Sequence, residues 1–213
     1  MKGKVLLTGY TSGIGKALYD ILVKEGYEVV GMSRRNGYDV SKWESWEKII
    51  NQHHKSFDYL ILNAGIAKFT PEEEYIIHKQ VINTNLLGVY YPLHNLESLL
   101  KEGGVCAVTA SSAAYHSSPE HPLYSAVKTA VVELVKSYTK IYNGKYRLFA
   151  VSPGLTLTNL GDQNYQIPEE VINNVPLKRY MTAEEMAEYY YTLLTKFKFL
   201  NGSEVVIDGG EHA

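Results

Sequence analysis

Short apolar runs alternate with stretches of helical periodicity along most of the chain. Each run is short enough for a strand, and in the helical stretches apolar residues recur at intervals of three and four, as Ile14, Leu18 and Ile21 do. Strands that are apolar throughout are typical of a parallel sheet with both faces covered. The pattern therefore predicts an α/β fold in which helices cover both faces of one sheet.

The individual elements follow from that alternation. We expect the third helix to bend near Gly88 and Pro92, whereas Pro122 suits the first turn of the helix after it. A polar segment over 159–179 shows only weak helical signals. The predicted strands are Lys4–Leu7, Glu28–Met32, Tyr59–Leu62, Val105–Thr109, Arg147–Val151 and Glu204–Ile207. The predicted helices are Gly13–Lys24, Trp43–His53, Glu73–Leu100, Leu123–Tyr142 and Ala183–Leu194.

One connection is unusually short. About seven residues, Ser33 to Asp39, separate the second strand from the Asp39-Val40 pair. A crossover between parallel strands needs about 10–12 residues or more. We therefore expect a loop here, with a stunted or missing third strand.

Composition narrows the classes of function. The 213 residues suit one domain, and 21 Lys plus Arg against 23 Asp plus Glu leave a net charge of −2. That balance offers no general attraction to nucleic acid or to an anionic membrane. No segment approaches the roughly 20 apolar residues of a membrane helix. The single cysteine, Cys106, cannot form an internal disulfide, which fits a reducing, cytoplasmic location.

A glycine-rich loop joins the first strand to the first helix, with the sequence Thr8-Gly9-Tyr10-Thr11-Ser12-Gly13-Ile14-Gly15. Gly9 permits a tight turn, Gly13 lets the backbone approach a pyrophosphate, and Gly15 allows close helix–sheet packing. The unpaired N–H groups at the helix N-terminus favour an anion there. We therefore predict a dinucleotide-binding loop whose contacts come from Gly9, Thr11, Ser12, Gly13, Ile14 and Gly15.

The end of the second strand bears on the identity of the dinucleotide. An acid at this point would bind the ribose 2′-hydroxyl and repel a 2′-phosphate. This chain has Ser33-Arg34-Arg35 instead, and no acid before Asp39. The planar guanidinium of Arg34 can pair with a phosphate, so the sequence favours NADP(H), with NAD(H) as the alternative.

Tyr124 and Lys128 are candidates for acid–base chemistry. They lie four residues apart on a predicted helix and so share one face. We expect the ammonium to lower the pKa of the phenol, which lets the pair give a proton to an alkoxide or take one from an alcohol. Ser111 follows the Val105–Thr109 strand at the end where open α/β sheets bind ligands, and its hydroxyl could hold a substrate carbonyl. Adjacent His53 and His54 point to different faces of a helix, so we predict no metal site.

These motifs and their order resemble those of the short-chain dehydrogenase/reductase family along nearly the whole chain. Residues 8–15 match its T-G-x-x-x-G-x-G pattern, and Ser111, Tyr124 and Lys128 fall at its Ser, Tyr and Lys positions. Further matches are Asn63-Ala64-Gly65, Asn85, Ser152-Pro153-Gly154 with Thr158, and Val206-Ile207-Asp208-Gly209-Gly210. The resemblance implies one Rossmann-type domain over residues 1–213, a doubly wound parallel sheet shortened between its second strand and Asp39.

The resemblance also implies a role for each site residue. Tyr124 is the acid/base, Lys128 lowers its pKa and holds the nicotinamide ribose, and Ser111 orients the substrate oxygen, with Ser112 as the alternative hydroxyl. Asn85 distorts its helix and anchors a water that links Lys128 to solvent. The segment over 159–179 covers the substrate. Further cofactor contacts are expected from Ser33, Arg34, Asp39, Val40, Asn63, Ala64, Gly65, Tyr124, Lys128, Pro153, Gly154, Thr156 and Thr158.

We therefore predict an NADP(H)-dependent oxidoreductase that interconverts a carbonyl and an alcohol by hydride transfer on a small molecule. By resemblance we expect a homodimer or homotetramer formed through the two long helices, with no nucleic-acid or membrane partner. The alternative is a non-catalytic NAD(P)-sensing or regulatory binding protein. The complete set of Asn85, Ser111, Tyr124 and Lys128 argues against that alternative, because a sensor has no use for it.

Overall fold

Six parallel strands form the central sheet of the computed structural model, which describes residues 2–67, 74–115, 121–158 and 169–212. Their order is β2-β1-β3-β4-β5-β8, so the chain winds outward in both directions from β1. A separate pair, β6 and β7, lies outside this sheet. The strands are β1 (Lys4–Thr8), β2 (Glu28–Met32), β3 (Phe57–Leu62), β4 (Leu100–Thr109), β5 (Arg147–Pro153), β6 (Thr156–Leu157), β7 (Met181–Thr182) and β8 (Ser203–Ile207).

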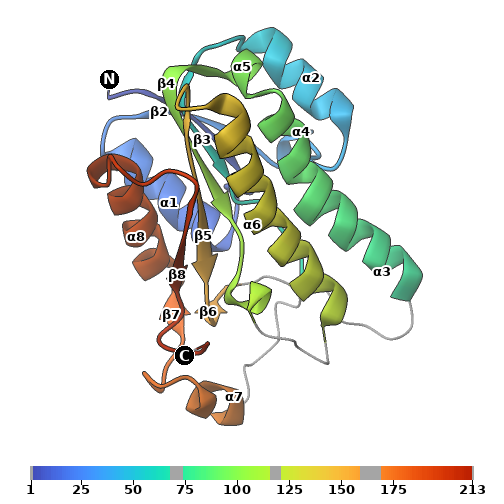
Figure 1. The fold of residues 1–213 in the computed structure, drawn as a ribbon, viewed down its shortest axis with the longest axis vertical. Helices are drawn as coiled ribbons and strands as arrows, with labels where there is room; N and C mark the ends of the chain where they lie inside the picture. Colours follow the sequence, from blue (N-terminus) through green and yellow to red (C-terminus); the bar gives the residue numbers. More distant parts are fainter. Residues whose placement is uncertain (1, 68–73, 116–120, 159–168, 213) are drawn as a thin grey trace.

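Helices cover both faces of the sheet, as Figure 1 shows. One face carries α1 (Gly13–Lys24) and α8 (Ala183–Lys196), which pack against each other. The other face carries α2 (Trp43–Gln52), α4 (Gly88–His94), α5 (Leu96–Leu99) and α6 (Pro122–Tyr142). Two further helices, α3 (Glu74–Val81) and α7 (Glu169–Asn174), lie towards the carboxyl edge of the sheet. The predicted doubly wound α/β architecture is confirmed.

Strand burial explains the apolar runs in the sequence. In β1, Val5 and Leu7 contribute to the core beneath α1 and α8, whereas Leu6 contributes to the core on the opposite face. All three side chains are fully buried. A central parallel strand therefore needs apolar residues at every position, and the alternation of polar and apolar residues seen in half-exposed strands is absent from β1.

The short connection after β2 also agrees with the prediction. Between Met32 and Trp43 the chain forms a 3₁₀ turn at Arg34–Asn36 and a loop, and β2 is left as the edge strand of the sheet. Asn36 N donates to Ser33 O at 3.2 Å, and Asn36 Oδ1 accepts from Ser33 N at 2.9 Å and from Ser33 Oγ at 3.1 Å. These hydrogen bonds hold the turn in place of a full helix.

Two elements differ most from the sequence predictions in extent, while others shift by one or two residues at an end. The helix expected over 73–100 is divided, with a π-helical segment at Ile82–Leu87 between α3 and α4, and its first residue lies outside the described ones. Gly88 follows that segment, where an added Cβ would lie 3.0 Å from Val40 Cγ2. β4 begins at Leu100, five residues earlier than expected, because Leu100 pairs with Phe57 before the register shifts. Over the described residues, none of the helices is long and apolar enough to cross a bilayer.

We predict that Gly15→Ala lowers the free energy of unfolding by roughly 2–3 kcal/mol, because α1 lies too close to the preceding turn for a side chain. A Cβ on Gly15 would lie 2.2 Å from Gly9 O. Chemical denaturation measures the change. Lys16→Ala, at an exposed neighbouring position, is the control and should stay within about 0.5 kcal/mol of the parent. Equal stability of Gly15→Ala and the parent would contradict the close contact.

Candidate active site

A cavity of about 700 Å³ lies at the carboxyl edge of the sheet. Its walls come from the loops that follow β1, β2, β3, β4 and β5 and from α6. Of the predicted site residues, Gly15 and Asn85 lie behind this wall. All the others line it, namely Gly9, Thr11, Ser12, Gly13, Ile14, Ser33, Arg34, Asp39, Val40, Asn63, Ala64, Gly65, Ser111, Tyr124, Lys128, Pro153, Gly154, Thr156 and Thr158.

The first turn of α1 offers an anion site. Gly9 and Gly13 have φ angles of +71° and +52°, which favour glycine. The Ser12 side chain makes no cap to the first N–H groups of α1, and no acid lies in its first turn. These N–H groups and the positive end of the helix dipole are therefore left without a cap from Ser12, as binding of a pyrophosphate requires. The residues of this loop fit a dinucleotide.

A buried hydroxyl holds the next loop in place. Thr8 Oγ1 accepts hydrogen bonds from Asn63 N and Ala64 N, each at 3.0 Å. Gly9 lies so close to this loop that an added Cβ would be 2.9 Å from Ala64 Cα. Sequence reasoning gave Thr8 no role beyond its place in the motif. A hydroxyl at the end of an otherwise apolar buried strand was the available signal.

The end of β2 presents two arginines to the cavity. Arg34 and Arg35 are both exposed and both line it. Asp39 lines the same region, but its Oδ1 accepts from Ser41 N at 3.0 Å and from Ser41 Oγ at 2.7 Å. Beneath it, Val40 O accepts from Trp46 Nε1 at 2.9 Å. Positive charge therefore dominates this end of the cavity.

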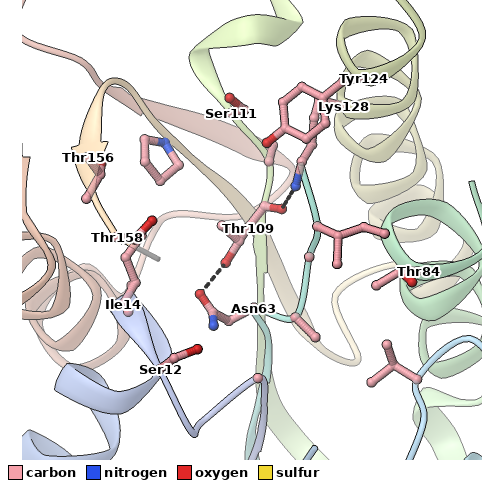
Figure 2. Close-up of a pocket in the computed structure, with 18 of the residues that line it drawn as sticks. Ser12, Ile14, Asn63, Thr84, Thr109, Ser111, Tyr124, Lys128, Thr156 and Thr158 are labelled. Carbon is pink, nitrogen blue, oxygen red and sulfur yellow. Dashed lines mark hydrogen bonds between the residues drawn. The ribbon is translucent and has the colours of Figure 1, made fainter. Parts of the chain in front are cut away.

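Tyr124 and Lys128 share one face of α6 and lie on the cavity wall, across from Ser12 and Ile14 in Figure 2. Lys128 Nζ donates to Thr109 O at 3.1 Å and lies 5.6 Å from the centre of the Tyr124 ring. The Lys128 side chain is almost fully buried, and this desolvation lowers its pKa to about 8.

Burial also has the largest effect on the pKa of the Tyr124 phenol. It raises the pKa of Tyr124 to about 12, while the nearby Ser111 hydroxyl acts in the opposite direction. The predicted lowering of this pKa by the neighbouring ammonium is therefore not what the structure shows. Desolvation of the phenolate has the larger effect, and Tyr124 holds its proton at neutral pH.

The two serines of the loop after β4 point to different partners. Ser111 Oγ accepts from Ala113 N at 3.2 Å, and its hydroxyl lies near enough to Tyr124 to lower the pKa of the phenol. Ser112 Oγ donates to Glu211 Oε2 at 3.0 Å. The geometry therefore favours Ser111 over Ser112 as the hydroxyl that faces the phenol.

Asn85 lies behind the cavity wall, in the π-helical segment Ile82–Leu87, and is fully buried. Its Oδ1 accepts from Ile66 N and its Nδ2 donates to Ile66 O, both at 2.8 Å. The Asn85 side chain thus hydrogen-bonds both the N–H and the carbonyl of Ile66. Its oxygen lies 3.3 Å from where a Cβ on Gly65 would be. The helix distortion expected at Asn85 is present, and the amide fixes the loop that passes Lys128.

Other lining residues were missed by sequence reasoning. Thr109 supplies the carbonyl that holds Lys128, and Thr84 and Gln80 also line the cavity. Glu211, from the end of the chain, lines it as well. No short motif marks such residues, because only tertiary packing brings them to the cavity. The segment expected to cover the substrate lies outside the described residues from 159 to 168.

Fold and site together define a Rossmann-type α/β protein with a ligand cavity at the carboxyl edge of its sheet. The family model described as enoyl-(acyl carrier protein) reductase matches residues 36–212. The chain belongs to the short-chain dehydrogenase/reductase family, and it is an NAD(P)-dependent oxidoreductase that acts on an alcohol or carbonyl group of a small molecule.

Relatives and solved structures agree with that assignment. The chain is 28% identical to the 3-oxoacyl-(acyl-carrier-protein) reductase FabG of Buchnera aphidicola, over 96% of this chain and 95% of that protein. It is 26% identical to the serine 3-dehydrogenase of Agrobacterium fabrum, over 94% and 91%. A short chain dehydrogenase family protein from Francisella tularensis has a similar structure, with a TM-score of 0.86, 26% identity and 99% coverage of both chains.

We predict that Lys128→Met raises the free energy of unfolding at neutral pH by on the order of 1–3 kcal/mol, because it removes a buried ammonium. Burial lowers the Lys128 pKa from 10.5 to about 8, so below pH 8 folding forces a charged group out of water. As the pH rises from about 8 towards 10.5, the ammonium is neutralised in the folded chain first and the penalty disappears.

Urea denaturation at two pH values measures this difference. The gain from Lys128→Met should be present at pH 7 and largely gone above about pH 10. Lys136→Met, on an exposed position of the same helix, is the control and should show no such pH dependence. A loss of stability in Lys128→Met at pH 7 would contradict the desolvation argument.

Proposed function

We propose that this chain is an NADP(H)-dependent enzyme that interconverts a carbonyl and an alcohol, with Tyr124 as the acid/base. The observation that carries the proposal is the placement of Tyr124, Ser111 and Lys128 on one wall of the cavity that also receives the N-terminus of α1. A protonated phenol beside a hydroxyl suits a carbonyl oxygen, and the uncapped helix end suits a phosphate.

The direction of the pKa shifts supports a reductive step. Because the pKa of Tyr124 is about 12, its hydroxyl is a proton donor at neutral pH. The Ser111 hydroxyl lies next to it and would hold the same carbonyl oxygen. When bound, NADPH supplies a hydride to the carbonyl carbon. The carbonyl π electrons then pass to the oxygen, which takes the proton of Tyr124 Oη and becomes the alcohol.

Lys128 would assist in two ways. Its ammonium lies under the face of the Tyr124 ring, where it stabilises the phenolate that remains after proton transfer. It also lies close to Gly65, where an added Cβ would be 3.8 Å from Nζ. The loop from 63 to 65 and Lys128 thereby form one surface on which the ribose next to the nicotinamide would rest.

The charges at the end of β2 support NADP(H) over NAD(H). Arg34 and Arg35 present guanidinium groups to the cavity, and such groups pair with phosphate in a bidentate manner. Asp39 is the acid that could instead hold a free 2′-hydroxyl, but its Oδ1 is engaged by Ser41. A 2′-phosphate would therefore meet two cations, while the one carboxylate among the described lining residues near them, Asp39, has Oδ1 engaged by Ser41.

We predict that Tyr124→Phe lowers kcat for NADPH-dependent carbonyl reduction by at least about a hundredfold, because the proton donor is lost. A carbonyl panel followed at 340 nm measures turnover, and quenching or enhancement of NADPH fluorescence measures binding. NADPH affinity should stay within a few-fold of the parent. Tyr189→Phe, at an exposed tyrosine of α8, is the control. Full turnover by Tyr124→Phe would refute the assignment, and tight NADPH binding by the parent with no turnover would favour a sensor.

We predict that Arg34→Ala reduces kcat/KM for NADPH by about tenfold or more and leaves that for NADH nearly unchanged, because only NADPH carries the 2′-phosphate. Paired kinetics with both cofactors measure the ratio. Lys24→Ala removes an exposed cation at the far end of α1 and should not change it. Equal losses for both cofactors would show that Arg34 does not read the 2′-phosphate.

A further inference from the structure

The two ends of the active-site cavity carry opposite charges. Arg34 and Arg35 follow β2 at one edge of the sheet, and Glu211 follows β8 at the other edge. Among the described lining residues the carboxylates are those of Asp39 and Glu211, and Asp39 is engaged by Ser41 near the arginines. At the far end, close to the serines of the loop after β4, the charge among the described lining residues is therefore that of Glu211.

The Glu211 carboxylate is held on the cavity wall by the loop that carries Ser111 and Ser112. Ser112 Oγ, on a side chain only 5% exposed, donates to Glu211 Oε2 at 3.0 Å. The same oxygen lies 2.9 Å from where a Cβ on Gly154 would be. The carboxylate thus lies between the loop that carries Ser111 and the loop that follows β5, and it presents an acceptor to the substrate end of the cavity.

The segment that carries Glu211 is fixed by its own contacts. Asp208 Oδ1 accepts from Gly210 N at 3.0 Å, and Glu211 N donates to Asp208 O at 3.3 Å. The Tyr115 ring packs on His212, with 5.3 Å between centroids, and the Tyr115 hydroxyl donates to Glu204 of β8. The end of the chain and the serine loop are therefore joined on both sides of Glu211.

We propose that Glu211 determines the substrate class of this enzyme. It favours carbonyl or alcohol substrates that carry a hydrogen-bond donor, such as a hydroxyl or an ammonium, next to the reacting carbon, and it disfavours substrates that carry a carboxylate there. A fixed carboxylate accepts hydrogen bonds from such donors and repels a second anion a few ångströms away. This inference rests on the proposed function, and it adds which polar groups the substrate carries next to its reacting carbon.

Three ketones of nearly equal size test this polarity. Hydroxyacetone carries a hydroxyl next to the carbonyl, 2-butanone carries a methyl group and pyruvate carries a carboxylate. With the parent enzyme and NADPH, kcat/KM should fall in that order. In Glu211→Gln the ratio of hydroxyacetone to pyruvate should drop by about tenfold or more, since the charge is lost while an oxygen remains for Ser112. Glu211→Lys should lower the ratio further.

A distant carboxylate provides the control. Glu133→Gln, at an exposed position of α6, should leave all three values unchanged. Where the small ketones turn over too slowly, the same comparison is made by the rise in Tm that propane-1,2-diol or lactate produces in the presence of NADP⁺. Propane-1,2-diol should give the larger rise with the parent, and the difference should shrink in Glu211→Gln.

The outcomes separate the two proposals. Turnover by the parent with the same hydroxyacetone-to-pyruvate ratio in Glu211→Gln would overturn the role of Glu211 and leave the proposed function standing. Equal Tm shifts by the diol and lactate would overturn it as well. Absence of turnover on the whole carbonyl panel, with NADPH bound, would instead defeat the proposed function.

Discussion

A buried ammonium is the constraint on which the rest of this site depends. Lys128 Nζ reaches the cavity from α6 and is held by the carbonyl of Thr109 at the end of β4. Burial without a strong partner destabilises the charged form, as the lowered pKa records. A folded chain tolerates a buried ammonium only when the packing around it offsets the free energy of desolvation. The covered sheet and the long helix α6 supply that packing.

Hydrogen bonds fix the loops at the carboxyl edge to one another, and so they fix the positions of the backbone groups that line the site. Thr8 holds the backbone after β3, and Asn85 holds the backbone of Ile66 a few residues later. Between these two anchors, Gly65 passes Lys128 without a side chain in the way. The loop that passes the ammonium is therefore positioned by hydrogen bonds to buried side chains and not by its own sequence propensity.

The sequence predicts the parts of the site that depend on local spacing. The glycines of the phosphate loop, the four-residue interval from Tyr124 to Lys128 and the short connection after β2 are all visible in it. The direction of the Tyr124 pKa shift is not, because proximity of an ammonium is readable from spacing whereas desolvation depends on side chains distant in sequence. Glu211 lies 99 residues from Ser112, so no local pattern could join them.

The short connection after β2 determines which residues lie at that end of the cavity. With a 3₁₀ turn in place of a helix and strand, β2 is the edge of the sheet, and none of the described strands lies beyond it at that end of the cavity. The aromatic ring of Tyr10 covers the face of β2 at Gly31, where an added Cβ would lie 2.4 Å from the ring. Under the proposed function, recognition there rests on the side chains that follow β2, above all Arg34 and Arg35. Exposed cations bind phosphate more weakly as salt increases, so under that proposal cofactor affinity at this end should depend on ionic strength more than the proton transfer proposed for Tyr124 beside the buried Lys128 does.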